Sequence, residues 1–134
     1  MATRVERLLR KHGIQASPQR VAVGEVVLFT ESHPTAEEVS TRARAKQSWL
    51  SRATVYNTLN LFVRKGLLRT SQLGEGPVVY DPKMAAHHHF IEERSGRIHD
   101  VPWEALKVEA VGKLKGLRVR EVQVILRGEP SSRK

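Results

Sequence analysis

Residues 51–66 read SRATVYNTLNLFVRKG, and this stretch decides the fold of the first half of the chain. Ser51 is a favourable N-cap and Gly66 a favourable C-terminal stop, so we predict a helix that runs to Lys65. One face of this helix is apolar and should be buried. The apolar positions are Val55, Leu59 and Phe62.

Further elements are predicted on both sides of this helix. Upstream, helices are expected over 3–12, 19–30 and 35–47, the last opened by the capping box Thr35–Glu38. Downstream, 67–73 and 78–80 flank a Gly-Glu-Gly-Pro turn and predict a β-hairpin. Three or four helices followed by a hairpin is the element order of a winged helix-turn-helix.

The second half of the chain has a different pattern. Strands are expected over 87–93, 97–101 and 119–127, and a helix over 104–114 with Leu106, Ala110 and Leu114 on one stripe. We therefore predict an α+β fold, with a winged helix-turn-helix DNA-binding domain over 1–82 and a small α/β dimerisation domain over 83–134. A unit of about 50 residues buries little surface alone, so pairing with a second copy is expected.

Composition narrows the class of partner. The 134 residues carry a net charge of +9, which favours contact with phosphate backbones of DNA or RNA. There is no cysteine, so any metal must be held by nitrogen and oxygen ligands. No apolar run is long enough for a membrane span or a signal peptide, and we expect a cytoplasmic protein without membrane contact.

The 51–66 helix has the polar face of a DNA-reading helix. In a helix-turn-helix, the N-terminal residues of the second helix contact base edges in the major groove. Arginine binds guanine or phosphate, and asparagine pairs with adenine. The candidates are Arg52, Thr54, Tyr56 and Asn57. The alternative is an ordinary amphipathic surface helix, and the capping-box helix and hairpin around it favour the DNA-reading interpretation.

A histidine triplet points to metal. On a strand, His87 and His89 share one face, and a His-x-His pair is a common metal platform. Further ligands would come from Asp81, Asp100 or His33. The alternative is a polar surface strand with no metal. An enzyme is not expected, because the chain lacks a general base of the His-Glu-x-x-His kind and we assign no catalytic residue.

Four motifs in order resemble the ferric uptake regulator (Fur) family of bacterial metal-responsive transcription factors. They are Ser17-Pro18-Gln19-Arg20, His33-Pro34-Thr35-Ala36-Glu37-Glu38-Val39, Ala53-Thr54-Val55-Tyr56-Asn57-Thr58-Leu59, and His87-His88-His89-Phe90 followed by Gly96-Arg97-Ile98. The resemblance implies a homodimer that binds a palindromic operator in double-stranded DNA, usually as a repressor. Arg20 joins the predicted DNA contacts.

The resemblance also implies a ligand set for one divalent metal per subunit. Carried over by position, the ligands are His33, Asp81, His87, His89 and Asp100. Nitrogen and oxygen donors suit Fe²⁺ or Mn²⁺, and also Zn²⁺. Aspartate at 81 and 100 resembles the peroxide-sensing branch (PerR), in which bound ferrous iron reacts with peroxide. The oxidation-sensitive residues would be His33 and His87.

Two features of the sequence depart from the usual Fur-family pattern and leave alternatives to peroxide sensing. Most Fur-family members hold a structural zinc on two Cys-x-x-Cys pairs, but here the first pair's positions are Glu92 and Ser95, and the second has no equivalent. The cysteine-free His-His-His-Phe segment also resembles the iron-response branch (Irr), whose members sense iron or haem, with haem as a possible cofactor. An iron- or haem-responsive regulator and a metal-independent winged-helix DNA-binding protein are the alternatives to peroxide sensing.

Overall fold

A computed structural model of the chain describes residues 1–131. The chain divides into two compact units, the first spanning Met1–Met84 and the second beginning at Ala85. Among the described residues, none of the helices has the length and apolarity needed to cross a lipid bilayer.

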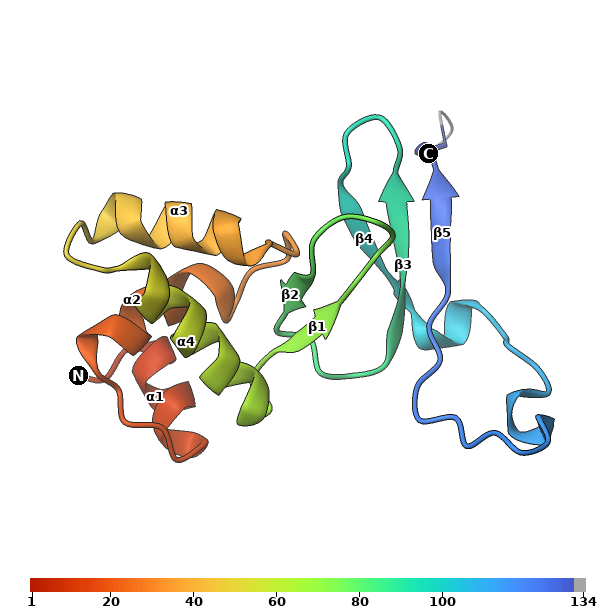
Figure 1. Ribbon diagram of the computed structural model, residues 1–134, viewed down its shortest axis with the longest axis horizontal. Helices are drawn as coiled ribbons and strands as arrows, with labels where there is room; N and C mark the ends of the chain where they lie inside the picture. The colour runs from red at the N-terminus through yellow and green to blue at the C-terminus, as the bar shows by residue number, and fades with distance from the viewer. Residues whose placement is uncertain (132–134) are drawn as a thin grey trace. The chain divides into compact units, whose positions relative to one another are not determined.

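Four helices form the first unit: α1 (Arg4–Lys11), α2 (Pro18–Val27), α3 (Ala36–Lys46) and α4 (Arg52–Arg64) (Figure 1). Each begins at a side chain that accepts a hydrogen bond from a backbone N–H of the first turn. These N-caps are Thr3, Ser17, Thr35 and Ser51. All four predicted helices are confirmed, because these caps are local signals. Helix α2 begins one residue before its predicted start, and every other helix end lies one to three residues inside the predicted limits.

The core of the first unit is aliphatic and aromatic and draws on all four helices. Val55, Leu59 and Phe62, the predicted inner face of α4, are each 0% exposed. Helices α1 and α2 approach closely at Gly24, where an added Cβ would lie 2.7 Å from the Val5 side chain. A larger residue at position 24 would force the Val5 side chain to shift and would disturb the packing of α1 on α2.

A two-stranded antiparallel ribbon, β1 (Arg69–Ser71) and β2 (Val79–Asp81), follows α4. It is the predicted hairpin, with a shorter first strand and a second strand that lies one residue later than predicted. Thr35, the N-cap of α3, forms a β-bridge with Val79, so the ribbon is joined to the start of the first helix of the helix-turn-helix. The predicted winged-helix order is therefore observed in the first unit.

The second unit contains a three-stranded sheet in the order β4-β3-β5. The central strand is β3 (His87–Glu92), which pairs antiparallel with β4 (Ile98–Pro102) and parallel with β5 (Ile125–Gly128). The first two strands confirm the prediction to within one residue. Strand β5 covers only the end of the predicted 119–127 strand.

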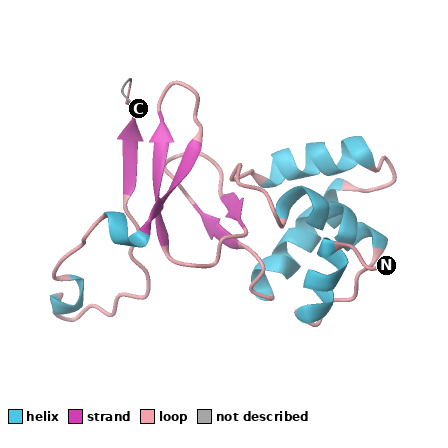
Figure 2. Cartoon of the chain, turned by 180° about the vertical axis from the view of Figure 1, so that it is seen from behind, coloured by secondary structure: helices cyan, strands magenta, loops and turns pink. Residues whose placement is uncertain are grey.

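The predicted helix over 104–114 is wrong. The structure has two 3₁₀ turns here, η1 (Trp103–Ala105) and η2 (Val111–Lys113), and Figure 2 draws the remainder of 106–124 as loop. A helix would carry Gly112 in its interior and would begin after Pro102 without a side-chain cap. Both features disfavour a helix, and Leu114 of the predicted stripe is 50% exposed, so no packing in the described chain compensates.

Candidate metal centre and DNA-binding surface

Two predicted metal ligands, His33 and Asp81, lie close together in the first unit. His33 is in the connection between α2 and α3, Asp81 closes β2, and His33 Nε2 lies 3.3 Å from Asp81 Oδ2. The connection is held beside β2 because the Tyr80 backbone N–H donates to the Pro34 carbonyl at 2.8 Å. Asp81 Oδ1 accepts the backbone N–H of Lys83 at 2.9 Å, which orients the carboxylate. Both ligand side chains are buried.

The backbone of His33 is strained. Its φ is 52°, in the left-handed region, which costs roughly 1–2 kcal/mol for most residues with a Cβ. Such a conformation persists only where the surrounding structure imposes it, and it is concentrated at functional sites. Here the bridge between Thr35 and Val79 and the Pro34–Tyr80 hydrogen bond impose it. In this conformation the imidazole lies beside Asp81.

The other three predicted ligands lie together in the second unit. His87 and His89 project from the same side of β3, as strand parity predicted, and their ring centroids are 4.7 Å apart. Asp100 on β4 is the register partner of His89. Asp100 Oδ1 lies 3.4 Å from His87 Nε2 and 3.8 Å from His89 Nε2.

A hydrogen bond sets the tautomer of His87. Its Nδ1 lies 2.6 Å from the Ala85 carbonyl oxygen, which can only accept, so Nδ1 carries a proton. In the neutral ring, Nε2 then presents its lone pair toward Asp100. A backbone carbonyl behind the imidazole is the usual arrangement for a metal-ligating histidine, because it fixes the ring orientation and raises the basicity of the other nitrogen.

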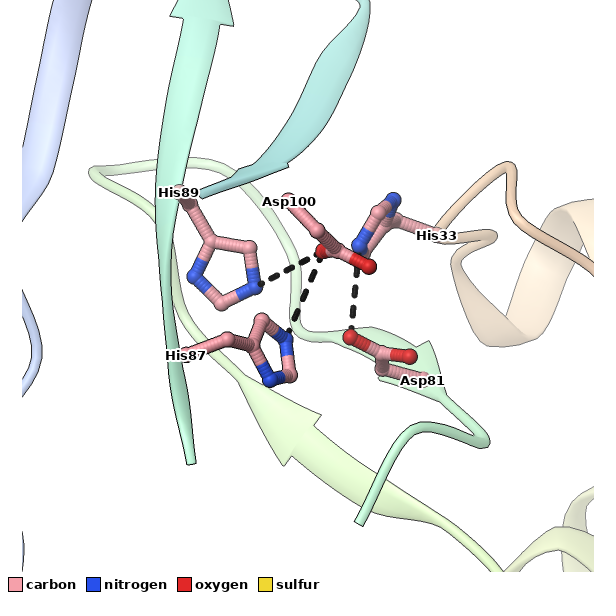
Figure 3. Close-up of side chains that lie close together, drawn as sticks. All are labelled: His33, Asp81, His87, His89 and Asp100. Carbon is pink, nitrogen blue, oxygen red and sulfur yellow. Dashed lines mark ion pairs between the residues drawn. The ribbon is translucent and has the colours of Figure 1, made fainter. Parts of the chain in front are cut away.

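The spacing within each set fits a first-row metal ion. Two atoms each about 2.1 Å from one ion are separated by about 3.0–3.4 Å at tetrahedral or octahedral angles. The nitrogen–oxygen distances of 3.3, 3.4 and 3.8 Å lie at or slightly above this range. Within each set the donor atoms lie within 4.8 Å of one another. Figure 3 shows these donor pairs as dashed lines.

Two remaining histidines have structural partners. His88 is 0% exposed, stacks on Trp103 at 4.6 Å, and accepts the Val124 backbone N–H at Nδ1 over 3.0 Å. It therefore joins β3 to the segment that precedes β5. Sequence reasoning missed Trp103 and Val124, because no local pattern links them to the triplet.

His99 is paired with Glu92, one of the positions at which the resemblance led us to look for cysteine. The hydrogen bonds from His99, and then from the Ser95 hydroxyl at 2.9 Å, hold the pKa of Glu92 below its ordinary value. These polar contacts link the two strands of the β3–β4 hairpin across its turn. Neither His88 nor His99 belongs to the set of metal-ligating side chains that lie together in the described part of the second unit, which consists of His87, His89 and Asp100.

Three of the predicted DNA contacts line one groove in the first unit, of about 500 Å³. They are Arg20, Thr54 and Asn57. The groove runs between the start of α2 and the outer face of α4, and its remaining lining residues are Gln15, Ser17, Gln19, Thr58, Leu61 and Arg64. Two arginines and no carboxylate line it, so the groove attracts anions. Arg64 was missed as a candidate because it lies at the C-terminal end of α4.

The other two predicted contacts, Arg52 and Tyr56, interact with each other and with an acidic residue. Arg52 Nη2 lies 2.6 Å from Glu37 Oε2 on α3, and the Tyr56 hydroxyl donates to the same oxygen at 3.1 Å. Arg52 Nη2 also donates to the Tyr56 hydroxyl at 3.2 Å. The hydrogen bond with Tyr56 and the charge of Glu37 raise the pKa of Arg52. The predicted DNA contacts therefore lie in two environments. One is the basic groove, and in the other the positive charge of Arg52 is balanced by Glu37.

Comparison with known protein families shows to which family the chain belongs. A sequence model of the ferric uptake regulator family matches residues 11–127. The chain belongs to the ferric uptake regulator family. The resemblance predicted from the four motifs is thereby confirmed.

Relatives at moderate identity are named as peroxide regulators. Over 98 residues, 73% of the chain, it is 34% identical to the peroxide-responsive repressor PerR of Staphylococcus epidermidis. It is 33% identical to the peroxide operon regulator of Bacillus subtilis over the same length. The matched stretch covers 65% and 68% of these relatives, so the chain spans about two thirds of their length.

Solved structures of Fur-family proteins share the fold. A zinc-bound manganese uptake regulator superposes with a TM-score of 0.71 at 23% identity, covering 96% of this chain and 100% of that one. The Campylobacter jejuni peroxide stress regulator gives a TM-score of 0.63 at 23% identity and covers 98% of this chain and 100% of that one. The predicted fold class, a winged helix-turn-helix followed by a small mixed domain, is confirmed.

Proposed function

We propose that the chain is a DNA-binding transcriptional regulator, a repressor rather than an enzyme, whose DNA affinity depends on one bound divalent metal. The observation that carries the proposal is the distribution of the histidine and aspartate ligands. The first unit, which holds the recognition helix α4, supplies His33 and Asp81. The second unit supplies His87, His89 and Asp100.

One ion takes ligands from both sets in this proposal. Two ligands are too few to hold a first-row metal tightly, and three leave coordination positions open. Only five residues separate Asp81, the last ligand of the first set, from His87, the first of the second. An ion bound by both sets therefore restricts the orientation of α4 relative to the second unit. Metal and DNA then favour the same conformer, and each tightens the binding of the other by about 1–3 kcal/mol.

The donors suit Fe²⁺ or Mn²⁺, and Zn²⁺ in purified samples. Solved relatives have been obtained with manganese, zinc and iron. When ferrous iron is bound, it supplies the redox chemistry by which peroxide oxidises a ligand. We propose His33 and His87 as the oxidised side chains. Oxidation of either would remove a metal ligand, so the protein would bind the metal less tightly and, with it, the DNA. The match to peroxide-responsive repressors supports this form of sensing.

On DNA, two copies of the chain place two α4 helices in successive major grooves of a palindrome. Arg20, Thr54 and Asn57 line the groove beside α4, where a strand of the duplex would lie. Support comes also from a zinc uptake regulator of the same fold, solved with zinc and DNA at a TM-score of 0.67 and 16% identity. The exposed apolar residues of the second unit offer a surface for the second copy.

One experiment tests metal dependence and peroxide sensing together. A DNA sequence enriched by the purified protein from a random duplex pool is titrated with chelated, Mn²⁺-loaded and Fe²⁺-loaded protein. We expect tighter binding with either metal, and after peroxide treatment, loss of binding only in the Fe²⁺ form. Peptide mass analysis of that form should place one added oxygen on His33 or His87.

The possible results separate the alternatives. If chelated protein binds the enriched DNA as tightly as metal-loaded protein, the chain is a metal-independent winged-helix protein. If metal is required but peroxide adds no oxygen to either histidine, iron- or haem-responsive regulation replaces peroxide sensing. Haem titration followed by absorption spectroscopy then tests the haem form of that alternative.

A further inference from the structure

The carboxylate of Glu37 contacts two of the predicted DNA-binding residues, Arg52 and Tyr56. Helix α4 has no acidic residue between Arg52 and Arg64, and the groove beside it is lined by no carboxylate. Glu37 instead comes from the second position of α3, the first helix of the helix-turn-helix. It is more exposed than buried, so burial does not explain the contact.

Glu37 engages two DNA-facing groups through one oxygen. Its Oε2 atom is 2.6 Å from Arg52 Nη2 and accepts the Tyr56 hydroxyl at 3.1 Å. The Arg52 guanidinium also lies 5.2 Å from the Tyr56 ring centroid. A phosphate oxygen approaching Arg52 or Tyr56 would bind the same donors that Glu37 occupies, and would be repelled by its charge.

We propose that Glu37 is a specificity-determining residue that competes with the DNA backbone for Arg52 and Tyr56. The inference rests on the proposed DNA-binding function. On DNA of arbitrary sequence, a backbone phosphate that replaces Glu37 only exchanges one anion for another at Arg52 and Tyr56, so the net gain in binding free energy is small. On the correct sequence, Arg52 gains base-edge acceptors in fixed positions, such as guanine O6 and N7, while Glu37 keeps the guanidinium oriented. Glu37 therefore lowers non-specific affinity more than specific affinity.

The size of the effect follows from the exposure of the pair. An exposed ion pair changes an equilibrium by up to about fivefold. Each additional phosphate neutralised by a cation steepens the dependence of log affinity on log salt by about 0.9. Removing the charge of Glu37 should therefore raise affinity for arbitrary DNA about three- to fivefold and steepen the salt slope by about 0.9.

The test uses the full chain loaded with Mn²⁺ and two fluorescent duplexes, one of arbitrary sequence and one enriched by the wild type from a random pool. Anisotropy titrations over a range of salt concentrations give affinity and slope for each. The variants are Glu37→Gln, Glu37→Asp and Glu25→Gln. Glu25 is exposed on α2, so its substitution changes the net charge equally and leaves Arg52 and Tyr56 untouched.

We expect Glu37→Gln to bind arbitrary DNA three to five times more tightly and to discriminate less, while Glu25→Gln stays near wild type. Glu37→Asp keeps the charge but shortens the reach to Arg52, and should lie between wild type and Glu37→Gln. Adding Arg52→Gln to Glu37→Gln should abolish the increase, because the released cation is gone.

Two results would overturn the proposal. One is that Glu37→Gln and Glu25→Gln match in affinity and slope, which would make the effect one of net charge. The other is weaker binding of arbitrary DNA by Glu37→Gln, which would make Glu37 a support for backbone contact. Wild-type protein that enriches no duplex from the random pool would contradict the proposed DNA-binding function itself, and that failure is distinguishable from both results.

Discussion

The two units of the chain bury different kinds of side chain. The first buries aliphatic and aromatic residues, among them Leu9, Val23 and Phe62. In the described part of the second unit, the buried residues are the histidines of β3, His87, His88 and His89. Burying apolar area is favourable by about 25 cal/mol per Å², whereas a buried imidazole must be hydrogen-bonded or ligated to avoid a penalty. The first unit is thus stabilised by its own packing, whereas we propose that the second gains stability from the metal that its buried histidines would bind.

The second unit also differs from the first in that one of its segments exposes several large apolar side chains. Large apolar side chains of the 103–119 segment remain 40–67% exposed: Trp103, Val108, Leu114, Leu117 and Val119. A group of this kind on one segment is typical of a surface that a protein partner covers. The second copy in the proposed dimer would cover it, and would give the segment the packing that a single chain does not supply.

The largest expected effect tests the packed core of the first unit. Phe62→Ala should lower the free energy of unfolding by about 3–5 kcal/mol, because Phe62 is 0% exposed at the centre of the helical core. Leu117→Ala, in the second unit and outside this core, is the control and should change the unfolding free energy of the first unit's helices by less than about 0.5 kcal/mol. Urea unfolding followed by circular dichroism measures both. Equal losses would show that the first unit depends on the second for its stability.

Metal removal should act mainly on the second unit. Saturating Mn²⁺ at about 100 times its Kd stabilises the bound form by about 2.7 kcal/mol. Hydrogen exchange of the β3 and β4 amides should accelerate on chelation, with smaller changes in α1 and α2, whose protection comes from the apolar core. His89→Ala, which lacks one ligand, is the control and should respond little to the metal. If chelation leaves the hydrogen exchange of the β3 amides in the wild type unchanged, the metal does not stabilise the second unit.

The preference of the protein for particular bases should depend on residues of the first unit. Asn57→Ala should relax preference at one base position of the enriched DNA by about 1–3 kcal/mol, because Asn57 lines the groove beside α4. Asn60→Ala on the same helix is the matched control, since Asn60 is exposed but absent from that lining. Titrations with single-base-substituted duplexes measure the preference. An unchanged preference in the Asn57 variant removes it from the readout.

The smallest expected effect concerns acid stability, where each unit has a carboxylate of lowered pKa. A backbone hydrogen bond from Thr3 lowers the pKa of Glu6, and the His99 hydrogen bond lowers that of Glu92. Each contributes stability above the unfolded pKa of about 4.3, and this contribution is lost as pH falls through the lowered folded value. Glu6→Gln and Glu92→Gln should each flatten the fall in stability below about pH 5. An unaltered pH profile would contradict the corresponding contact.

The helices and the hairpins were predictable because their signals are local. The capping boxes at Thr3 and Thr35 and the Ser17-Pro18 start each depend on residues within one turn. The pairing of His87 with His89 on one side of β3 followed from strand parity. Such features need no knowledge of distant packing.

The parts that could not be predicted depend on contacts between distant residues. The 104–114 segment has a helical stripe, but in the described chain nothing buries it, and its propensity is too weak to form a helix alone. The contact of Glu37 with Arg52 spans two helices, and that of His88 with Val124 joins residues 36 apart in sequence. In sequence, Glu37 is one residue of a capping box, and its position gives no sign of a contact with DNA-facing groups.

In the proposed metal centre, the left-handed backbone of His33 limits which metals the chain can be engineered to bind. Glycine, asparagine and aspartate tolerate that conformation, but only aspartate among them offers a strong, charged metal donor. A thiolate ligand for softer ions would require cysteine at a φ it rarely adopts, and glutamate would meet the same strain. A redesign toward a different ion therefore starts more easily from Asp81 or Asp100, and position 33 keeps the centre among nitrogen and oxygen donors.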